Sequence, residues 1–197
     1  LVDEKNKKHW VKVAYSMLRI PSLGTFDGSR FKHLDDGFEV TIAGKRFSVF
    51  RPGTIDLVTS LDRGTQIITP KDMASILFYC DIKAGDTILE IGAGSGSLTT
   101  ALTSAVAPDG KVHTVEVRKE NISNTQKNLK RTGLDKYWSY QIGDAKSTKV
   151  DIVADALIMD VPDPENMLDN ILPCLRSGGR ICSYVPKDQT SPPFITI

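Results

Sequence analysis

The stretch TILEIGAGSGSLT (Thr87–Thr99) decides the fold. Its first part, Thr87–Ile91, is apolar and β-branched apart from one acid, which is typical of a buried strand. Three glycines spaced two apart follow it, and glycine weakens a segment unless a side chain would prevent a needed close approach. The stretch therefore predicts a βα unit whose turn receives a nucleotide-like ligand.

Strands and helices alternate on both sides of this unit. The expected strands are 87–91, 111–117, 138–142, 156–161 and 180–185, and the expected helices are 97–106, 119–132 and 164–175. Upstream, residues 54–61 predict a short helix, and residues 63–80 predict a short strand followed by a helix. This alternation predicts an α/β domain with a parallel, doubly wound sheet over residues 54–197.

Residues 1–53 have a different pattern and predict a small β domain. The stretches HWVKVAYSML (His9–Leu18) and FEVTIAGKRFSVFRP (Phe38–Pro52) alternate apolar and polar residues, and IAGKRF supplies a hairpin turn. TFDGSRFKHLDDG, between them, is rich in turn residues.

Composition sets wider bounds. The 197 residues are 40% hydrophobic with a net charge of +1, which suffices for one α/β domain with a small appendage. We expect no membrane span and no signal peptide, because no apolar segment is long enough and the first residues have no apolar centre. We expect no metal site, because the three histidines are scattered. Cys80, Cys174 and Cys182 form no CxxC pair, so we expect reduced, buried thiols and a cytoplasmic protein.

The glycine spacing separates two ligand classes. Gly92, Gly94 and Gly96 form GxGxG, whereas a dinucleotide fingerprint needs its third glycine at Ser97, so the turn is a poor NAD site. GxGxG with Glu90 two residues before it resembles motif I of the class I S-adenosylmethionine (SAM) methyltransferases.

Three more acids end later strands at the sheet edge where open α/β sheets bind ligands. Glu116 is placed for the ribose hydroxyls, Asp144 for the adenine amine, and Asp160 for the region beside the sulfonium and the substrate. Taken singly, Glu116 can be a solvated strand end and Asp144 a turn cap. All four in order favour SAM binding.

The longer motifs resemble one family. The segments DRGTQIITPKD (Asp62–Asp72), LEIGAGSGSLT (Leu89–Thr99), MDVPDP (Met159–Pro164) and LRSGGRICSYVP (Leu175–Pro186) are similar to the tRNA (adenine-58-N1)-methyltransferase family. The resemblance runs through nearly the whole chain, including the β domain, and the first of these segments is the most discriminating.

The resemblance implies SAM-dependent methylation of adenine N1 in the T-loop of tRNA, by a homotetramer or a related heteromeric assembly. Asp160 is then the catalytic residue beside the target base, and Tyr184 lines the substrate site unless it is a core aromatic. The implied cofactor contacts are Gln66, Glu90, Gly92, Gly94, Gly96, Ser97, Leu98, Thr99, Glu116, Asp144 and Asp160.

An acid at Asp160 suits this reaction. A carboxylate that accepts a hydrogen bond from the exocyclic amine of adenine stabilises the positive charge that develops as N1 attacks the methyl group. Most of the rate comes from alignment of the two reactants, and the base must first be turned out of the folded tRNA.

Two departures from the family stand out. Position 69 is threonine where many members have tyrosine or histidine, which leaves the manner of base recognition open. After SYVP the family continues with a helix and two strands, so we expect the C-terminal strands to be incomplete here, with FITI (Phe194–Ile197) part of a late strand.

Three alternatives stay open at this point. A small-molecule methyltransferase of the cobalamin-precursor type generally lacks a preceding β domain, and an isoaspartate carboxyl methyltransferase lacks the DxPxP ending. A non-catalytic tRNA-binding subunit loses glycines or the Asp160 equivalent, which this chain keeps. Its basic clusters are each more typical of solvated surface than of a phosphate contact; they are Lys5–Lys8, Arg30 with Lys32, Lys45–Arg46 and Lys127–Arg131.

Overall fold

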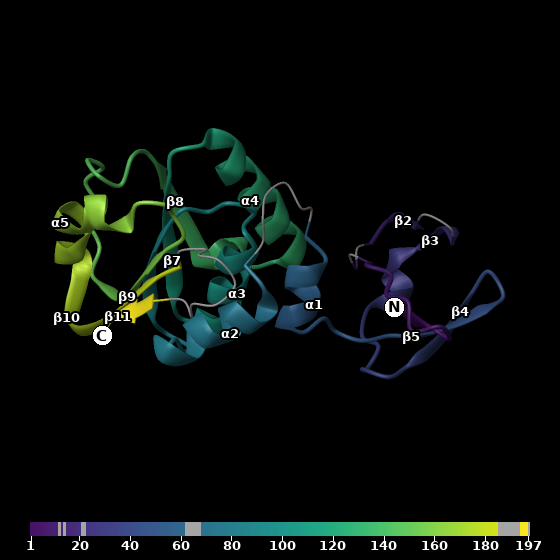
Figure 1. Ribbon diagram of the computed structural model, residues 1–197. Coiled ribbons are helices and arrows are strands. Elements are labelled where there is room, and N and C mark those ends of the chain that lie inside the picture. Colours follow the sequence, from purple (N-terminus) through teal and green to yellow (C-terminus); the bar gives the residue numbers. More distant parts are fainter. Residues whose placement is uncertain (12, 14, 21–22, 62–67, 185–193, 197) are drawn as a thin grey trace. The chain divides into compact units, whose positions relative to one another are not determined.

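A computed structural model describes residues 1–11, 13, 15–20, 23–61, 68–184 and 194–196. The chain divides into two compact units, Leu1–Gly53 and Thr54–Ile197. In the second unit, the described strands form a six-stranded sheet in the order β11-β10-β9-β6-β7-β8 (Figure 1). They are β6 (Thr87–Ile91), β7 (Lys111–Glu116), β8 (Trp138–Ile142), β9 (Ala154–Met159), β10 (Leu175–Ser183) and β11 (Phe194–Thr196).

Five of these strands are parallel, as predicted, and β11 pairs antiparallel with β10. The chain runs outward from β6 to β7 and β8 and then returns to the far side of β6 through β9. Ligands of open α/β sheets bind at such a reversal, outside the carboxyl ends of the central strands. The topology therefore directs attention to the residues that follow β6 and β9.

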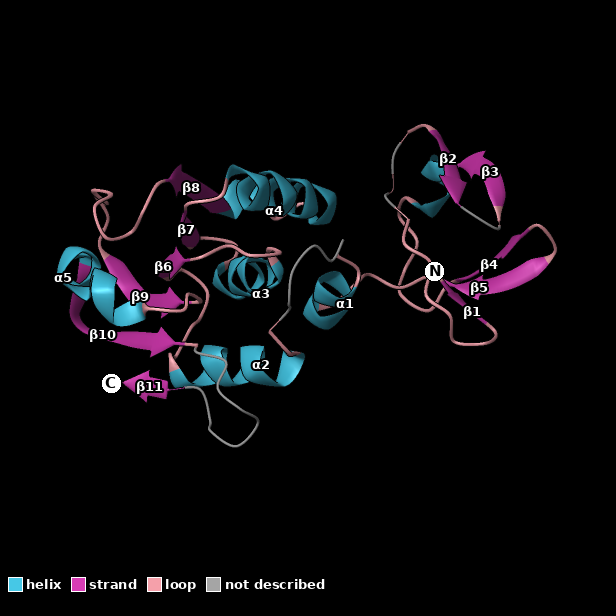
Figure 2. Cartoon of the chain, turned by 45° about the horizontal axis from the view of Figure 1, so that its top comes forward, coloured by secondary structure: helices cyan, strands magenta, loops and turns pink. Residues whose placement is uncertain are grey.

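Helices cover both faces of the sheet. They are α1 (Thr54–Thr59), α2 (Pro70–Tyr79), α3 (Ser97–Val106), α4 (Lys119–Thr132) and α5 (Leu168–Ile171). Figure 2 shows α2, α3 and α4 on one side of the sheet and α5 on the other. Each face buries its own apolar cluster, one including Ile76, Ile88 and Leu102, the other including Leu89, Leu157 and Ile171. This two-sided burial explains why the central strands have nearly continuous apolar sequences.

The predicted helix over 164–175 is wrong in its continuity. The structure has 3-10 turns at Pro164–Met167 and Leu172–Cys174 on either side of the short α5. Pro173 explains the break, because a proline has no N–H for the helical ladder and its ring clashes with the preceding turn. The strand expected between residue 63 and α2 falls largely on residues outside the described part of the chain.

The first unit holds two small antiparallel sheets. One contains β1 (Val2–Asp3), β4 (Glu39–Ile42) and β5 (Lys45–Ser48), and the other contains β2 (Met17–Ile20) and β3 (Gly24–Asp27). The hairpin predicted at IAGKRF is confirmed, since Ile42 pairs with Lys45 across Ala43 and Gly44, both at positive φ. In the stretch His9–Leu18, by contrast, strand β2 begins only at Met17.

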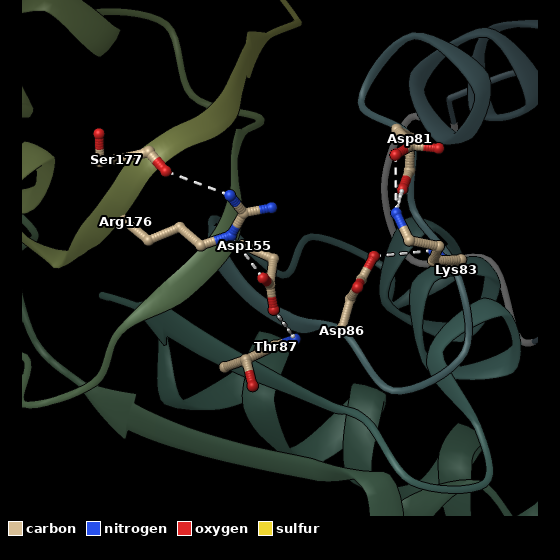
Figure 3. Close-up of polar contacts among 7 residues, drawn as sticks. All are labelled: Asp81, Lys83, Asp86, Thr87, Asp155, Arg176 and Ser177. Carbon is tan, nitrogen blue, oxygen red and sulfur yellow. Dashed lines mark hydrogen bonds and ion pairs between the residues drawn. The ribbon is translucent and has the colours of Figure 1, made fainter.

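The amino edge of the large sheet is held by ion pairs (Figure 3). Asp155 accepts hydrogen bonds from Nε of Arg176 at 2.7 Å and from the backbone N–H of Thr87 at 2.8 Å. Nearby, Nζ of Lys83 lies 2.7 Å from a carboxylate oxygen of Asp81. Each of these acids thus has a cation beside it.

No helix in the described ranges is long and apolar enough to cross a membrane.

Candidate active site at the carboxyl edge of the sheet

The glycine turn after β6 depends on glycine. Gly92, Gly94 and Gly96 have φ values of +90°, +50° and +78°. A Cβ at Gly92 would lie 2.5 Å from the carbonyl oxygen of Asp160, and one at Gly96 would lie 2.8 Å from Oγ1 of Thr125. The turn therefore brings bare backbone against the start of the β9–α5 loop, and it leads directly into the N-terminus of α3.

Glu116, at the end of β7, holds this turn in place. Its Oε2 accepts hydrogen bonds from the backbone N–H of Ala93 at 3.0 Å and Gly94 at 3.4 Å, and from Nδ2 of Asn121 at 2.9 Å. Its Oε1 accepts one hydrogen bond from the described residues, from the N–H of Arg118 at 2.9 Å. Burial acts to raise the pKa of Glu116, but these hydrogen bonds outweigh it and hold the pKa below its ordinary value. Glu116 is 5% exposed and is no solvated strand end.

Asp160, directly after β9, is the least satisfied acid of the site. Its backbone N–H donates to the carbonyl of Ile91 at 2.8 Å, which fixes the residue beside the glycine turn. Its carboxylate accepts no hydrogen bond from any residue that the structure describes. Burial, with a smaller contribution from the charge of Glu116, raises its pKa to about 6. An acid of this kind in a crevice is a candidate functional group.

Glu90 lies below the turn and not in the crevice. It is fully buried, and its carboxylate accepts hydrogen bonds from Oγ1 of Thr99 at 2.8 Å and Oγ1 of Thr114 at 2.6 Å. The indole N–H of Trp138 donates to the same Thr114 hydroxyl at 2.8 Å. Burial raises the pKa of Glu90 to about 8. Glu90 therefore ties α3 to β7 beneath the turn, and its predicted contact with the cofactor stays a prediction.

Asp144 lies two residues after the end of β8 and caps the turn that follows. Its Oδ1 accepts a hydrogen bond from the N–H of Lys146 at 2.9 Å, and the side chain is exposed. The capping interpretation is therefore confirmed, and the other carboxylate oxygen has no partner among the described residues. Val117, after Glu116, is 58% exposed and offers an apolar surface at the same edge of the sheet.

The first turn of α3 faces inward. Ser97, Leu98 and Thr99 are each at most 4% exposed, so a ligand can meet this turn only through its backbone. The N-terminus of a helix favours an anionic group through its free N–H groups and its dipole. Gln66, the remaining predicted cofactor contact, lies outside the described residues.

Tyr184 follows β10 and lies on the other side of Asp160. Its backbone N–H donates to Met159 at 2.8 Å, and its hydroxyl donates to Oδ2 of Asp72 at 3.4 Å. The same Asp72 oxygen accepts a hydrogen bond from Oγ1 of Thr69, the N-cap of α2, at 2.8 Å. Burial raises the pKa of Tyr184, and the charges of Asp72 and Asp160 add to this. Tyr184 also packs on the apolar cluster, so its ring belongs partly to the core.

Sequence reasoning missed the supporting residues Asn121 and Thr114. Asn121 has a local signal, since it lies in the first turn of α4, just after the Glu116 strand end. Thr114 has none, because only the pairing of β6 with β7 brings it opposite Glu90. Within the described ranges, no group of three or more His, Cys, Asp or Glu side chains is arranged to hold a metal ion.

The chain is similar in sequence to known tRNA methyltransferases. The TrmI protein of Methanocaldococcus jannaschii, a tRNA (adenine(57)-N(1)/adenine(58)-N(1))-methyltransferase, is 30% identical over 213 residues, which covers 94% of this chain and 74% of the relative. The catalytic subunit of the tRNA (adenine(58)-N(1))-methyltransferase of Dictyostelium discoideum is 31% identical, but this chain spans only 43% of its length.

Two solved structures share the fold. A SAM-dependent O-methyltransferase from Thermotoga maritima superposes with a TM-score of 0.76 and 31% identity, covering 94% of this chain and 70% of that one. The tRNA (m1A58) methyltransferase TrmI from Aquifex aeolicus superposes with a TM-score of 0.68 and 24% identity, covering 88% and 68%. The predicted methyltransferase-type α/β fold is confirmed.

The family model described as "tRNA methyltransferase complex GCD14 subunit" matches residues 49–190. Because this match extends over well more than half of the chain and includes the glycine turn, Glu116 and Asp160, the protein belongs to that tRNA methyltransferase family.

Proposed function

We propose that this chain methylates N1 of adenine in the T-loop of tRNA, at position 58, with SAM as the methyl donor. The observation that carries the proposal is Asp160, a half-buried carboxylate with a raised pKa beside a backbone-lined glycine turn. The names of the M. jannaschii and D. discoideum relatives support the substrate, and the family model supports the class of reaction.

The residues at the carboxyl edge suit SAM. Glu116 keeps free acceptor capacity on Oε1, which a ribose hydroxyl can use. Val117 offers an exposed apolar face for adenine, and the free oxygen of Asp144 an acceptor for its amine. Bound SAM supplies an electrophilic methyl group on a sulfonium; the work of the chain is to bind, to orient and to stabilise charge.

Asp160 acts on the target base. Its carboxylate accepts a hydrogen bond from the exocyclic amine of adenine, which places N1 and stabilises the positive charge that forms there. With a pKa raised to about 6, most of the carboxylate is still ionised at neutral pH, and a fall of about one pH unit protonates a large part of it. Val161 and Pro162 follow, and the fixed φ of proline stiffens the backbone at this point.

We also propose that the chain works in the cytoplasm as a homotetramer or as one subunit of a related assembly. The description of the family as a complex subunit supports an assembly. The three free cysteines, all buried, suit a reducing compartment.

The test is methyl transfer from labelled SAM to unmodified tRNA, with identification of the product nucleoside. We expect N1-methyladenosine from the wild-type chain, and a turnover several hundred-fold lower for Asp160→Ala with SAM affinity retained. Tight SAM binding without tRNA methylation would move the substrate to the small-molecule or carboxyl-methylating alternatives. Failure to bind SAM would favour a non-catalytic subunit.

A further inference from the structure

The two units of the chain carry charges of opposite sign. Residues 1–53 contain ten Lys and Arg against six Asp and Glu, a net charge of +4, whereas residues 54–197 contain 15 against 18, a net charge of −3. A net charge of +1 for the whole chain conceals this difference. A polyanion is therefore attracted to the first unit and repelled by the second.

The first unit has a cleft of about 270 Å³ that combines apolar walls with cations. Its walls include Val13, Leu34 and Phe50, and its polar lining includes Lys32 and Arg51. We call it the Lys32–Arg51 cleft. Its volume lies just below that of sites for whole small molecules, roughly 300–1,000 Å³, and suits part of a larger ligand.

The two cations of this cleft are available to an anion. Neither Lys32 nor Arg51 forms a side-chain ion pair with any residue in the described part of the chain. Nζ of Lys32 lies 4.0 Å from the ring centroid of Tyr15, a side chain that is itself 77% exposed. Asp36, the acid of the cleft, already accepts a hydrogen bond from the backbone N–H of Arg51.

One feature of the walls suits a flat, unsaturated group, and a second is frequent at ligand-binding positions. The ring of Phe50 is 51% exposed, a loss of burial that the fold alone does not require. His33, which also lines the cleft, has a φ of +67°, a conformation that costs energy in a residue other than glycine and that occurs often at ligand-binding positions.

We propose that the Lys32–Arg51 cleft binds one unpaired nucleotide of the RNA substrate, with a phosphate against the two cations and the base against Phe50. The proposal rests on the proposed function, which supplies the RNA. An unpaired nucleotide is specified because only an unstacked base offers its face to an aromatic side chain. The site is separate from the crevice that holds Asp160, because every lining residue belongs to the first unit.

The first experiment measures binding of the full chain to an unmodified tRNA transcript over a series of salt concentrations. Lys32→Ala with Arg51→Ala is compared with Lys5→Ala with Lys45→Ala, two exposed lysines of the same unit that do not line the cleft. For the cleft pair we expect about a tenfold higher Kd, and a dependence of log Kd on log salt concentration whose slope is smaller by about 1 to 2. For the other pair we expect the Kd to rise by less than about threefold. Equal effects of the two pairs would overturn the proposal, because they would show a diffuse field and no site.

The second experiment tests the base. Phe50→Ala is compared with Phe38→Ala, since the two rings are 51% and 52% exposed and only Phe50 lines the cleft. We expect tRNA affinity to fall by about tenfold for Phe50→Ala alone, with SAM affinity and thermal unfolding like wild type. An equal loss for both variants, or for neither, would overturn the stacking role.

The outcomes separate the two proposals. If the wild-type chain methylates tRNA while the cleft variants bind it like their controls, only the cleft assignment fails. If the wild-type chain binds SAM but neither binds nor methylates tRNA, the proposed function fails.

Discussion

Two acids at opposite ends of the large sheet, Asp155 at the amino edge and Asp160 at the carboxyl edge, have pKa shifts of opposite sign. At the amino edge, Asp155 lies against Arg176, and a backbone N–H and that guanidinium hold its pKa below the ordinary value. At the carboxyl edge, the half-buried Asp160 and the fully buried Glu90 form no ion pair within the described residues, and their pKa values rise to about 6 and about 8, whereas hydrogen bonds hold the pKa of Glu116 low. At the amino edge, the pairing of Asp155 with Arg176 contributes to stability. At the carboxyl edge, the unpaired carboxylate of Asp160 stays available for the reaction.

The contrast follows from where the chain reverses. The strand ends at the carboxyl edge must leave a crevice, and Asp160, which borders it, has no described group that pairs with its carboxylate, whereas Glu116 has several hydrogen-bond donors. The amino edge has no such requirement and can be closed by hydrogen bonds (Figure 3). Active sites commonly have lower intrinsic stability for this reason, and substitutions there stabilise a protein while they remove its activity.

Two isosteric changes, Asp160→Asn and Asp155→Asn, test most directly whether the first acid serves activity and the second stability. For Asp160→Asn we expect turnover on tRNA to fall by about 10²–10³, or about 3–4 kcal/mol, because an amide carries no charge to stabilise the methylated base. At pH 8 its free energy of unfolding should stay equal or rise, because an unpaired buried charge has been removed.

Asp155→Asn should do the reverse. It weakens hydrogen bonds to Arg176 and Thr87 and should lower the free energy of unfolding by about 1–2 kcal/mol with turnover unchanged. Denaturant titration and initial rates on the same samples decide the matter. If Asp160→Asn destabilises the chain as much as Asp155→Asn does, the division between the edges is wrong.

A second pair of variants compares one glycine from each edge of the sheet. Gly92, at the carboxyl edge, and Gly85, before β6 at the amino edge, have nearly the same φ, +90° and +92°. A Cβ at Gly85 meets nothing within 4 Å, whereas a Cβ at Gly92 lies 2.5 Å from the carbonyl oxygen of Asp160. Both changes to alanine carry the cost of a left-handed residue, about 1–2 kcal/mol.

Only Gly92→Ala must also move the Asp160 backbone. We therefore expect Gly85→Ala to lower stability but to bind SAM like wild type, and Gly92→Ala to lose at least about tenfold in SAM affinity as well, measured by calorimetric titration. Equal SAM affinities for the two variants would show that the turn tolerates a side chain, and the close approach of the two loops would then have no role in binding.

Much of this edge was predictable because its signals are local. GxGxG, Glu116, Asp160 and the alternation of strands and helices are all contained in short stretches, and they lie where they were predicted apart from the broken helix at 164–175. The exact role of Glu90 was not, because its depth depends on partners in α3 and β7 that only the folded sheet supplies. The pairing of Asp155 with Arg176 was hidden for the same reason, since it joins two strands across the β9–β10 connection. Pro173 did carry a local signal for the broken helix, which the periodic apolar pattern outweighed.

The last comparison uses Glu90→Gln, and the sign of its effect on stability distinguishes the edges. The pKa of Glu90 is about 8 in the folded chain against an ordinary value near 4.5. Between these values the folded state holds a proton that the unfolded state has lost, so this residue makes the free energy of unfolding fall as pH rises, by up to about 1.4 kcal/mol per pH unit. Its contribution to stability is complete below pH 4.5 and is lost by pH 8.

Glutamine keeps the shape and cannot ionise, so Glu90→Gln should flatten this slope between pH 5 and pH 8 and leave the acid limb unchanged. Asp155→Asn is the matched control, because the pKa of Asp155 is lowered in the folded chain and its contribution is lost only as pH falls through that lowered value. Denaturant titrations across pH 3–8 therefore separate the variants, one on each limb of the profile. If Glu90→Gln keeps the wild-type dependence of stability on pH above pH 5, Glu90 holds no extra proton in the folded chain. Glu90 would then be ionised like Asp155, and the difference between these two acids would disappear.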